Sequence, residues 1–445
     1  MTAQLQTLWR SLRQGRFIRR VGILVGATGV GQAIAILVSP LLTRLYTPTD
    51  FGTYAVFAAI MGVLAAVACL RYESAIPVPP EPAEARIVLI LSVLVALLMA
   101  SVSALAIGLL GGWITIAVDT PDLRPLLWLL PLGVLLIGTY NALRRWAVRE
   151  RDFVSIARTK LTQSVSAVVV QILLGVGTHS GPWGLALGSI AGQSAGIMTL
   201  FRRMRRTPIA SSTPGHDHTV LKAAWRYRRF AMYSAPSALV NSLTLYAPSV
   251  LIAAFFGPAA AGFYALTQRV LGVPTTVLGK AISDVFLGEA AAAGRVRDFA
   301  GMVRLFRRTF MLLLVCSAAL IGTVAFVAPA TFGLVFGDAW SEAGLYVRAL
   351  APMYAMAFVA SPFGGVLSVL ERQDLFLLRE LIRAPLVIGT LVVAAVIGAS
   401  PLTAITALGL AGAVGYMIYV MLSWHAVRQV ARKAEHRNVH LGDDG

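Results

Sequence analysis

Long apolar runs separated by short polar segments repeat along the whole chain. Each run reaches the roughly 20 residues that a helix needs to cross about 30 Å of hydrocarbon. The pattern predicts an all-α, polytopic membrane protein with twelve transmembrane helices. The predicted spans are 21–45, 51–70, 87–112, 125–147, 161–179, 182–201, 231–256, 259–287, 309–328, 344–370, 384–400 and 402–424.

Positive charge is distributed unevenly over the segments that join these spans. The chain has 38 Lys and Arg residues, and nearly all of them fall on one side of the predicted membrane. The other side has only Arg44, Arg124 and Arg348, while Arg269 and Lys280 lie within a predicted span. Because positively charged loops stay in the cytoplasm, both termini are predicted to be cytoplasmic.

Composition narrows the class further. Hydrophobic residues make up 57% of the chain and charged residues 13%, against about 25% charged in soluble domains. The net charge of +18 belongs to the short loops, which favours anionic membrane lipids over nucleic acid as partners. The sequence shows no Walker phosphate loop, no metal or cofactor motif and no catalytic constellation, so the chain is not expected to be an enzyme.

Two turns in the chain resemble each other and indicate an internal repeat. Pro48, Gly52, Tyr54 and Ala55 of the first turn correspond in order to Pro258, Gly262, Tyr264 and Ala265 of the second. The repeat predicts two pseudo-symmetric six-helix lobes, residues 1–206 and 230–445, joined by a cytoplasmic linker at 207–229. An even number of spans gives both lobes the same orientation, as in transporters that hold their substrate between the repeats.

The span 259–287 carries polar residues where charge is costly. Arg269 and Lys280 are eleven residues apart, which leaves a net rotation of about 20° and a separation of about 16 Å along a helix. Each cation would cost about 2.5–3.5 kcal/mol in the hydrocarbon, so a cavity lined by Arg269, Lys280 and Gln268 and suited to an anion is the functional interpretation. Alternatively, Lys280 reaches the inner surface or pairs with Asp284, and Arg269 reaches the outer surface.

Four further charged residues are weaker candidates. Arg44, at the outer end of the first span, fits either substrate contact or anchoring at the interface. Arg71 and Glu73, at the inner end of the second span, fit an inner gate or a simple surface pair. Glu73 and Asp284 are the candidates for coupling to protons or sodium, although surface charge is the favoured interpretation for both.

Several segments resemble the bacterial polysaccharide-export family of flippases, which belongs to the multidrug, oligosaccharidyl-lipid and polysaccharide exporter superfamily. They are 41–54 (LLTRLYTPTDFGTY), 70–77 (LRYESAIP), 262–274 (GFYALTQRVLGVP) and 281–286 (AISDVF). The resemblance implies a V-shaped fold of two six-helix lobes in the bacterial cytoplasmic membrane. It also implies transport of an oligosaccharide repeat unit on a polyprenyl diphosphate carrier, from the inner to the outer leaflet, by alternating access.

The implied process is the synthesis of lipopolysaccharide or exopolysaccharide, with a polysaccharide polymerase and chain-length proteins as possible partners. One alternative is a transporter of the same fold with another cargo, such as a peptidoglycan lipid precursor or a drug. A drug-cation exporter would favour carboxylates within the membrane, whereas this sequence shows cations there. A membrane glycan polymerase or ligase is the other alternative, but the predicted outer loops are short and lack catalytic groups.

Overall fold

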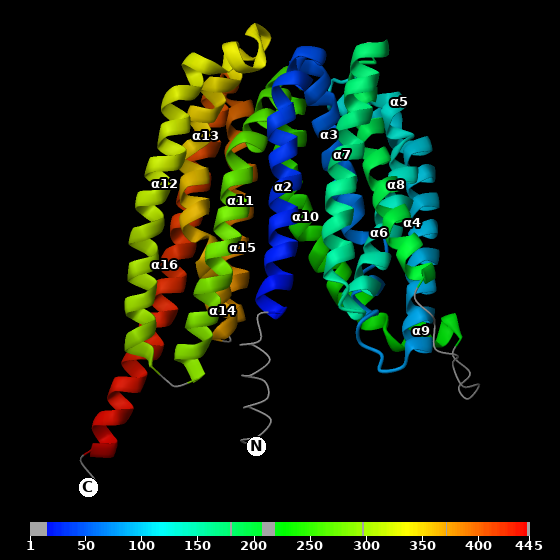
Figure 1. The fold of residues 1–445 in the computed structure, drawn as a ribbon. Helices are drawn as coiled ribbons and strands as arrows, with labels where there is room; N and C mark the ends of the chain where they lie inside the picture. The colour runs from blue at the N-terminus through cyan, green and yellow to red at the C-terminus, as the bar shows by residue number, and fades with distance from the viewer. Residues whose placement is uncertain (1–15, 179, 207–218, 296–297, 371, 443–445) are drawn as a thin grey trace. The chain divides into compact units, whose positions relative to one another are not determined.

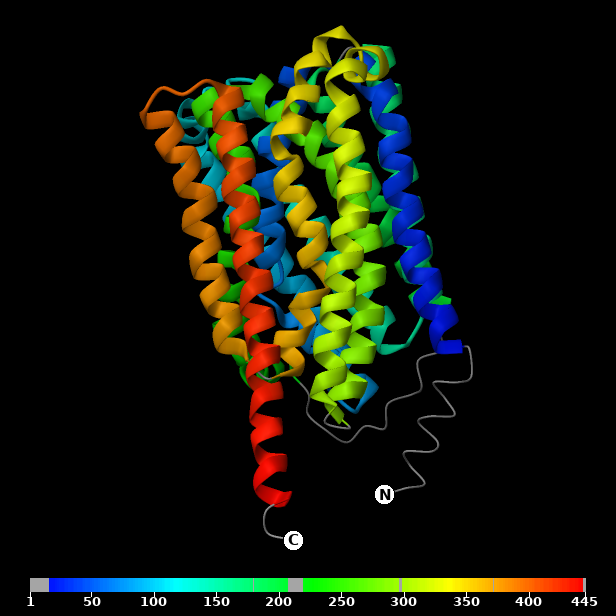
Figure 2. The same cartoon turned by 90° about the vertical axis from the view of Figure 1, so that its left-hand side faces the viewer.

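The computed structural model describes residues 16–178, 180–206, 219–295, 298–370 and 372–442. In these ranges all regular structure is helical, which confirms the all-α class (Figures 1 and 2). Ten helical stretches are long and apolar enough to cross a membrane, and two shorter apolar helices, Gly29–Leu45 and Leu381–Val396, bring the described number to twelve. Six of them precede residues 207–218 and six follow, in agreement with the predicted order.

The chain divides into two compact units, Met1–Gly262 and Phe263–Gly445. The lobe boundaries expected from the sequence, 1–206, 207–229 and 230–445, stay a prediction. In the first unit α2 packs on α7, α7 on α8, α3 on α10, and α4 on α6. Their bounds are α2 Arg16–Leu45, α3 Pro48–Val67, α4 Pro82–Ala117, α6 Leu130–Arg149, α7 Phe153–Thr178, α8 Pro182–Arg206 and α10 Ala235–Phe256, with the short α5 at Leu123–Leu127.

The start of α3 is fixed by local hydrogen bonds. The Thr47 hydroxyl accepts a hydrogen bond from the Asp50 backbone N–H at 3.2 Å, and the Asp50 carboxylate accepts one from the Thr47 backbone N–H at 2.9 Å. This reciprocal capping box satisfies two backbone donors that a helix start leaves unpaired. Pro48 at the first helical position has no N–H to satisfy, so the helix begins sharply after Tyr46.

The two turns of the predicted repeat meet each other. A Cβ on Gly52 would overlap the carbonyl oxygen of Pro258, and a Cβ on Gly262 would overlap that of Pro48. Each copy of the motif therefore places its glycine against the proline of the other copy, as in a contact with two-fold symmetry. The first turn of α11 (Pro258–Arg295) thus belongs to the first unit, which ends at Gly262.

One end of the first unit is closed by short elements. These are the 3₁₀ turn η1 (Tyr72–Ala75), α9 (Val220–Arg226) and the π-helical turn η2 (Phe230–Ser234). On α4, Glu84 is 5% exposed and accepts hydrogen bonds from Tyr227 at 3.0 Å and Arg226 at 2.9 Å. Arg149 of α6 donates to the carbonyl oxygens of Ile76, Pro79 and Pro80 and so fastens the segment between η1 and α4.

The second unit contains the rest of α11 and seven further helical segments. They are α12 Phe299–Phe336, α13 Ser341–Ala360, the 3₁₀ turn η4 Ser361–Phe363, α14 Gly364–Val369, α15 Gln373–Val396 and α16 Pro401–Gly442, with the 3₁₀ turn η3 at Asp338–Trp340. α13 packs on α12 and α16, and α15 packs on α16. The Phe306 and Phe363 rings stack at 3.9 Å between centroids, with Phe286 edge-on to Phe363 at 5.3 Å. α16 continues past the ends of α12 and α15 (Figures 1 and 2).

Candidate functional site

The predicted cavity residues on α11 have different surroundings. Gln268 and Arg269 are half-buried, whereas Lys280 is exposed. Gln268 is a hydrogen-bond partner of the Tyr264 hydroxyl, one helical turn earlier. Their roles in substrate binding stay a prediction, as does ion coupling by Asp284, whose side chain lies outside the described residues.

Three tyrosines from three helices gather beside Gln268. Tyr264 of α11 interacts electrostatically with Tyr416 of α16, and both interact with Tyr354 of α13. Tyr264 is 3% exposed, whereas Tyr354 and Tyr416 are half-buried. The hydroxyls and the Gln268 amide form a polar patch in an otherwise apolar unit, and such a patch suits sugar or phosphate oxygens better than hydrocarbon.

Two arginines of α15 join this aromatic patch. The guanidinium carbon of Arg383 lies 5.9 Å from the centroid of the Tyr416 ring, and that of Arg379 lies 4.4 Å from the centroid of the Tyr419 ring. Arg383 also interacts with Tyr264. Cation–π contacts of this kind hold a guanidinium in place while its N–H groups can still donate to an anion.

Sequence reasoning missed Arg379 and Arg383 because it began this span at residue 384. α15 begins at Gln373, so both arginines lie inside the helix. The shorter apolar helix begins at Leu381, which places Arg383 within its apolar part. The signal that could have found them is the helical spacing of four residues between the two arginines, which puts them on one face.

A second cluster of charges lies in the first unit, at the turn after α3. Arg71 pairs with Glu73 at 3.5 Å, and Arg144 and Arg145 of α6 also act on the Glu73 carboxylate. The sequence analysis did not single out Arg144 and Arg145, which lie on the last turns of α6. The structure therefore brings three guanidinium groups to one carboxylate.

Glu73 is buried, and the favoured interpretation as a surface charge was wrong. The residue is only 6% exposed. Burial raises the pKa of the Glu73 carboxyl, although a backbone hydrogen bond and the charges of Arg71, Arg145 and Arg144 oppose that shift. Three cations do not fully offset the loss of hydration, so this carboxyl accepts a proton more readily than an exposed one.

Arg44 is the remaining residue of the predicted set. Arg44 occupies the last turn of α2 and is exposed.

Between α7 and α8, Gln163 donates a hydrogen bond to Gln193 at 3.0 Å. The Lys160 amine lies 5.5 Å from the centroid of the Tyr140 ring. These contacts give the first unit a polar interior that the sequence analysis did not single out.

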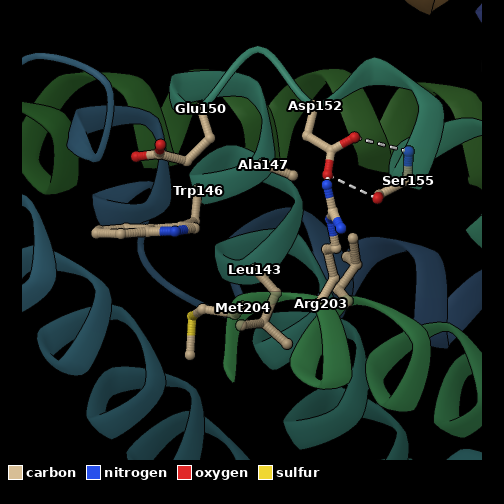
Figure 3. A pocket seen from close by; sticks show the side chains of 9 residues that line it. Leu143, Trp146, Ala147, Glu150, Asp152, Ser155, Arg203 and Met204 are labelled. Carbon is tan, nitrogen blue, oxygen red and sulfur yellow. Dashed lines mark hydrogen bonds and ion pairs between the residues drawn. The ribbon is translucent and has the colours of Figure 1, made fainter. Parts of the chain in front are cut away.

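A small pocket lies where α6, α7 and α8 meet (Figure 3). Asp152 points at Ser155 and Arg203 there; it accepts hydrogen bonds from the Ser155 N–H at 3.1 Å, the Ser155 hydroxyl at 2.7 Å and Arg203 Nε at 3.1 Å. Burial tends to raise the pKa of Asp152, but these hydrogen bonds and the Arg203 charge outweigh burial and lower it. The carboxylate caps α7 and ties it to α8, which is a structural role.

Among the described residues, no group of three or more His, Cys, Asp or Glu side chains is placed to hold a metal ion. The polar groups described in the second unit are guanidinium, amide and phenol groups, which bind anions and hydroxyl-rich molecules.

Comparison with known proteins assigns the chain to a family. The model of the family described as polysaccharide biosynthesis protein matches residues 41–344. The chain belongs to this family. The match confirms the resemblance drawn from the segments of the first two and the seventh and eighth spans. No curated protein sequence matches the chain.

Solved structures show the fold of this polysaccharide biosynthesis protein. An inward-facing multidrug resistance MATE family transporter of the MOP superfamily superposes with a TM-score of 0.71 at 14% identity, covering 93% of this chain and 99% of the other. The lipid II flippase MurJ, inward closed, gives 0.70 at 11% identity with coverages of 94% and 92%. A MOP superfamily transporter from Pyrococcus furiosus gives 0.61 at 14%, with coverages of 93% and 96%. The chain thus has the fold of multi-pass membrane transporters and flippases.

Proposed function

We propose that this protein is a flippase that moves a polyprenyl-diphosphate-linked oligosaccharide repeat unit from the cytoplasmic to the outer leaflet by alternating access. The family is associated with polysaccharide biosynthesis, and the fold is shared with a lipid II flippase. The proposal places the protein in the bacterial cytoplasmic membrane with both termini inside. It supplies repeat units to a polymerase and chain-length proteins, for lipopolysaccharide or exopolysaccharide.

The observation that carries the proposal is the cationic and aromatic patch of the second unit. Arg383 beside Tyr416, with Gln268 and Arg269 on α11, offers donors to a diphosphate and ring faces to a sugar. A phosphate oxygen about 4 Å from a cation gains on the order of 4 kcal/mol at an effective dielectric of 20. In a helix bundle this gain offsets the cost of placing the cations there.

Carboxylates of the described spanning helices argue against a drug cation as cargo. Asp50, Glu84, Asp338 and Glu342 lie at the first turns of their spans, and Asp284 and Glu289 lie in the last third of α11. A site for organic cations would need negative charge well inside the bundle. The solved Pyrococcus furiosus transporter was described as having a binding pocket of reversed polarity and a different function, which supports the idea that this fold accepts cargo of either sign.

The test follows lipid-linked oligosaccharide in cells that lack the protein and carry a variant on a plasmid. Arg269→Ala with Lys280→Ala, and separately Arg383→Ala, are expected to reduce surface glycan at least tenfold, since one charged hydrogen bond is worth about 1.5–3 kcal/mol. The repeat unit should accumulate on the cytoplasmic leaflet. Arg307→Ala with Arg308→Ala, which removes two exposed cations of α12, is the matched control and should export normally.

Full export by both sets of variants, at normal protein levels in the membrane, would refute the cationic site. Normal repeat units on both leaflets together with an altered glycan linkage would indicate a polymerase or ligase instead. Accumulation of the peptidoglycan lipid precursor rather than the repeat unit would identify the other lipid-linked cargo.

A further inference from the structure

The charge cluster of the first unit, defined as Arg71, Glu73, Arg144 and Arg145, has an excess of half-buried positive charge. Three guanidinium groups act on a single carboxylate, and Arg71 forms an ion pair with Glu73 at 3.5 Å. Removing charge from water is costly unless each ion is paired and hydrogen-bonded. Two positive charges of this cluster have no counterion within it.

Individual atoms of the cluster are buried without hydrogen-bond partners. They include the Nε atoms of Arg71, Arg144 and Arg145, the Oε2 atom of Glu73 and the hydroxyl of the adjacent Ser74. Each unmade hydrogen bond of a buried polar group is destabilising, so a cluster of five unpaired atoms calls for a physical explanation. The three Nε groups need an acceptor, whereas Oε2 of Glu73 needs a donor.

The cluster lies at a strained turn, and its Arg71 side chain reaches solvent. Arg71 has a left-handed backbone conformation with φ of 65°, and Leu70 before it has φ of 45°, which is costly for residues with a side chain. The Arg71 side chain is 33% exposed, against 8% for that of Glu73. A ligand arriving from solvent would therefore meet the Arg71 guanidinium first and the carboxylate last.

We propose that Arg71, Arg144 and Arg145 bind a phosphate-ester anion and that Glu73 takes up one proton from the surrounding water when the anion binds. The anion supplies negative charge that the three guanidinium groups lack within the cluster, and the proton removes the negative charge that would repel it. The raised pKa of Glu73 agrees with this, because little further perturbation is needed to protonate the carboxyl.

Other titratable groups near Glu73 do not account for such a proton. Elements α4, α6 and η2 pack against η1. From α6 come Arg144 and Arg145, and η2 (FAMYS) has no charged residue. On α4, Glu84 is engaged by Arg226 and Tyr227. The Cys69 thiol, which faces Glu73, is buried and its pKa is raised, so it stays neutral at working pH.

The experiment measures binding of a probe to the purified protein in nanodiscs of a zwitterionic lipid. UDP-N-acetylglucosamine is the probe, because its diphosphate is esterified at both ends and gains no proton near neutral pH. If one proton is taken up per anion, affinity should rise by up to about tenfold for each pH unit of acidification. The affinity rises as the pH falls from the pKa of Glu73 in the complex to its lower pKa in the free protein. Below the pKa of the free protein the affinity no longer changes with pH. Calorimetry in two buffers of different ionisation heat counts the protons directly.

Two kinds of variant separate the anion site from its proton. Glu73→Gln should keep the probe bound and abolish both the pH dependence and the proton uptake. Arg144→Gln with Arg145→Gln should weaken binding at least tenfold at every pH, while Arg158→Gln, an exposed cation of α7, is the matched control. If the double variant folds poorly, Arg145→Lys retains the charge and tests the guanidinium geometry alone.

Absence of saturable probe binding to the wild type, or equal pH dependence in the wild type and Glu73→Gln, would overturn the proposal. Nanodiscs with phosphatidylglycerol distinguish the sources of the anion: competition with the probe identifies a lipid phosphodiester, and unchanged binding identifies a diphosphate delivered from outside the bilayer. This proposal does not rest on the proposed function, because the binding measurements do not involve glycan export. Normal export by Glu73→Gln would leave the binding results and the conclusion drawn from them unchanged.

Discussion

Replacing Gly52 with alanine tests the contact between the two repeated turns. The added Cβ would overlap the carbonyl oxygen of Pro258 and lie 3.0 Å from its Cα. Both neighbours are backbone atoms, so no side chain can rotate away and the first turns of α3 and α11 must separate. Overpacking costs about 1–3 kcal/mol, and a clash with rigid backbone belongs at the upper end of that range.

An opposing effect is the higher helix propensity of alanine, worth about 1 kcal/mol. We therefore expect Gly52→Ala to lower the free energy of unfolding by about 2 kcal/mol. Gly262→Ala should have a similar effect, because its Cβ would overlap the Pro48 carbonyl oxygen. The assay is the midpoint of thermal unfolding in detergent, followed by fluorescence-detected gel filtration.

The matched control is Gly112→Ala in α4, where an added Cβ meets no heavy atom within 4 Å. It should be neutral or slightly stabilising. If Gly52→Ala and Gly262→Ala were as stable as Gly112→Ala, the close approach of the two turns would be refuted, and with it the structural basis of the repeat.

Two further predictions concern ion pairs of the first unit. Asp152→Asn should lower the melting temperature at pH 7, while Glu150→Gln, a neighbouring exposed site, should not. Folding lowers the pKa of Asp152, so its contribution to the free energy of unfolding is complete above the usual carboxyl pKa and is lost as the pH falls through the lowered value. The melting temperatures of the wild type and Asp152→Asn should therefore converge in acid. A difference that stays constant with pH would contradict this. Arg226→Gln leaves the buried Glu84 without its 2.9 Å partner and should cost about 1–3 kcal/mol, with faster limited proteolysis within α9; unchanged proteolysis would show that the pair does not hold α9.

Hydropathy predicted the helices well because the membrane imposes one length and one composition on each span. It failed where a helix carries charge at its end. α15 begins at Gln373, eleven residues before the predicted span, because Arg379 and Arg383 ended the apolar run in the sequence. A second difference has another cause. The predicted span at 344–370 is interrupted by η4, where Pro362 lacks the N–H that a continuous helix needs.

Individual site residues were less predictable than spans. Glu73 looks like a surface charge in the sequence, since α4, α6 and η2, which pack on its turn, are not visible in local hydropathy. Arg144 and Arg145 do not stand out in the sequence among the many cations of the predicted cytoplasmic side. Charge near a span end has two physical uses, topology and binding, and only the three-dimensional neighbours distinguish them.

The reciprocal contact of Gly52 and Gly262 restricts how the duplicated turns can change. An altered Pro48 changes the surroundings of Gly262, and an altered Pro258 changes those of Gly52. The two turns are constrained together, because the glycine of each lies against the proline carbonyl of the other. A side chain added at either glycine would therefore disturb both turns at once, which couples two segments 210 residues apart in the sequence.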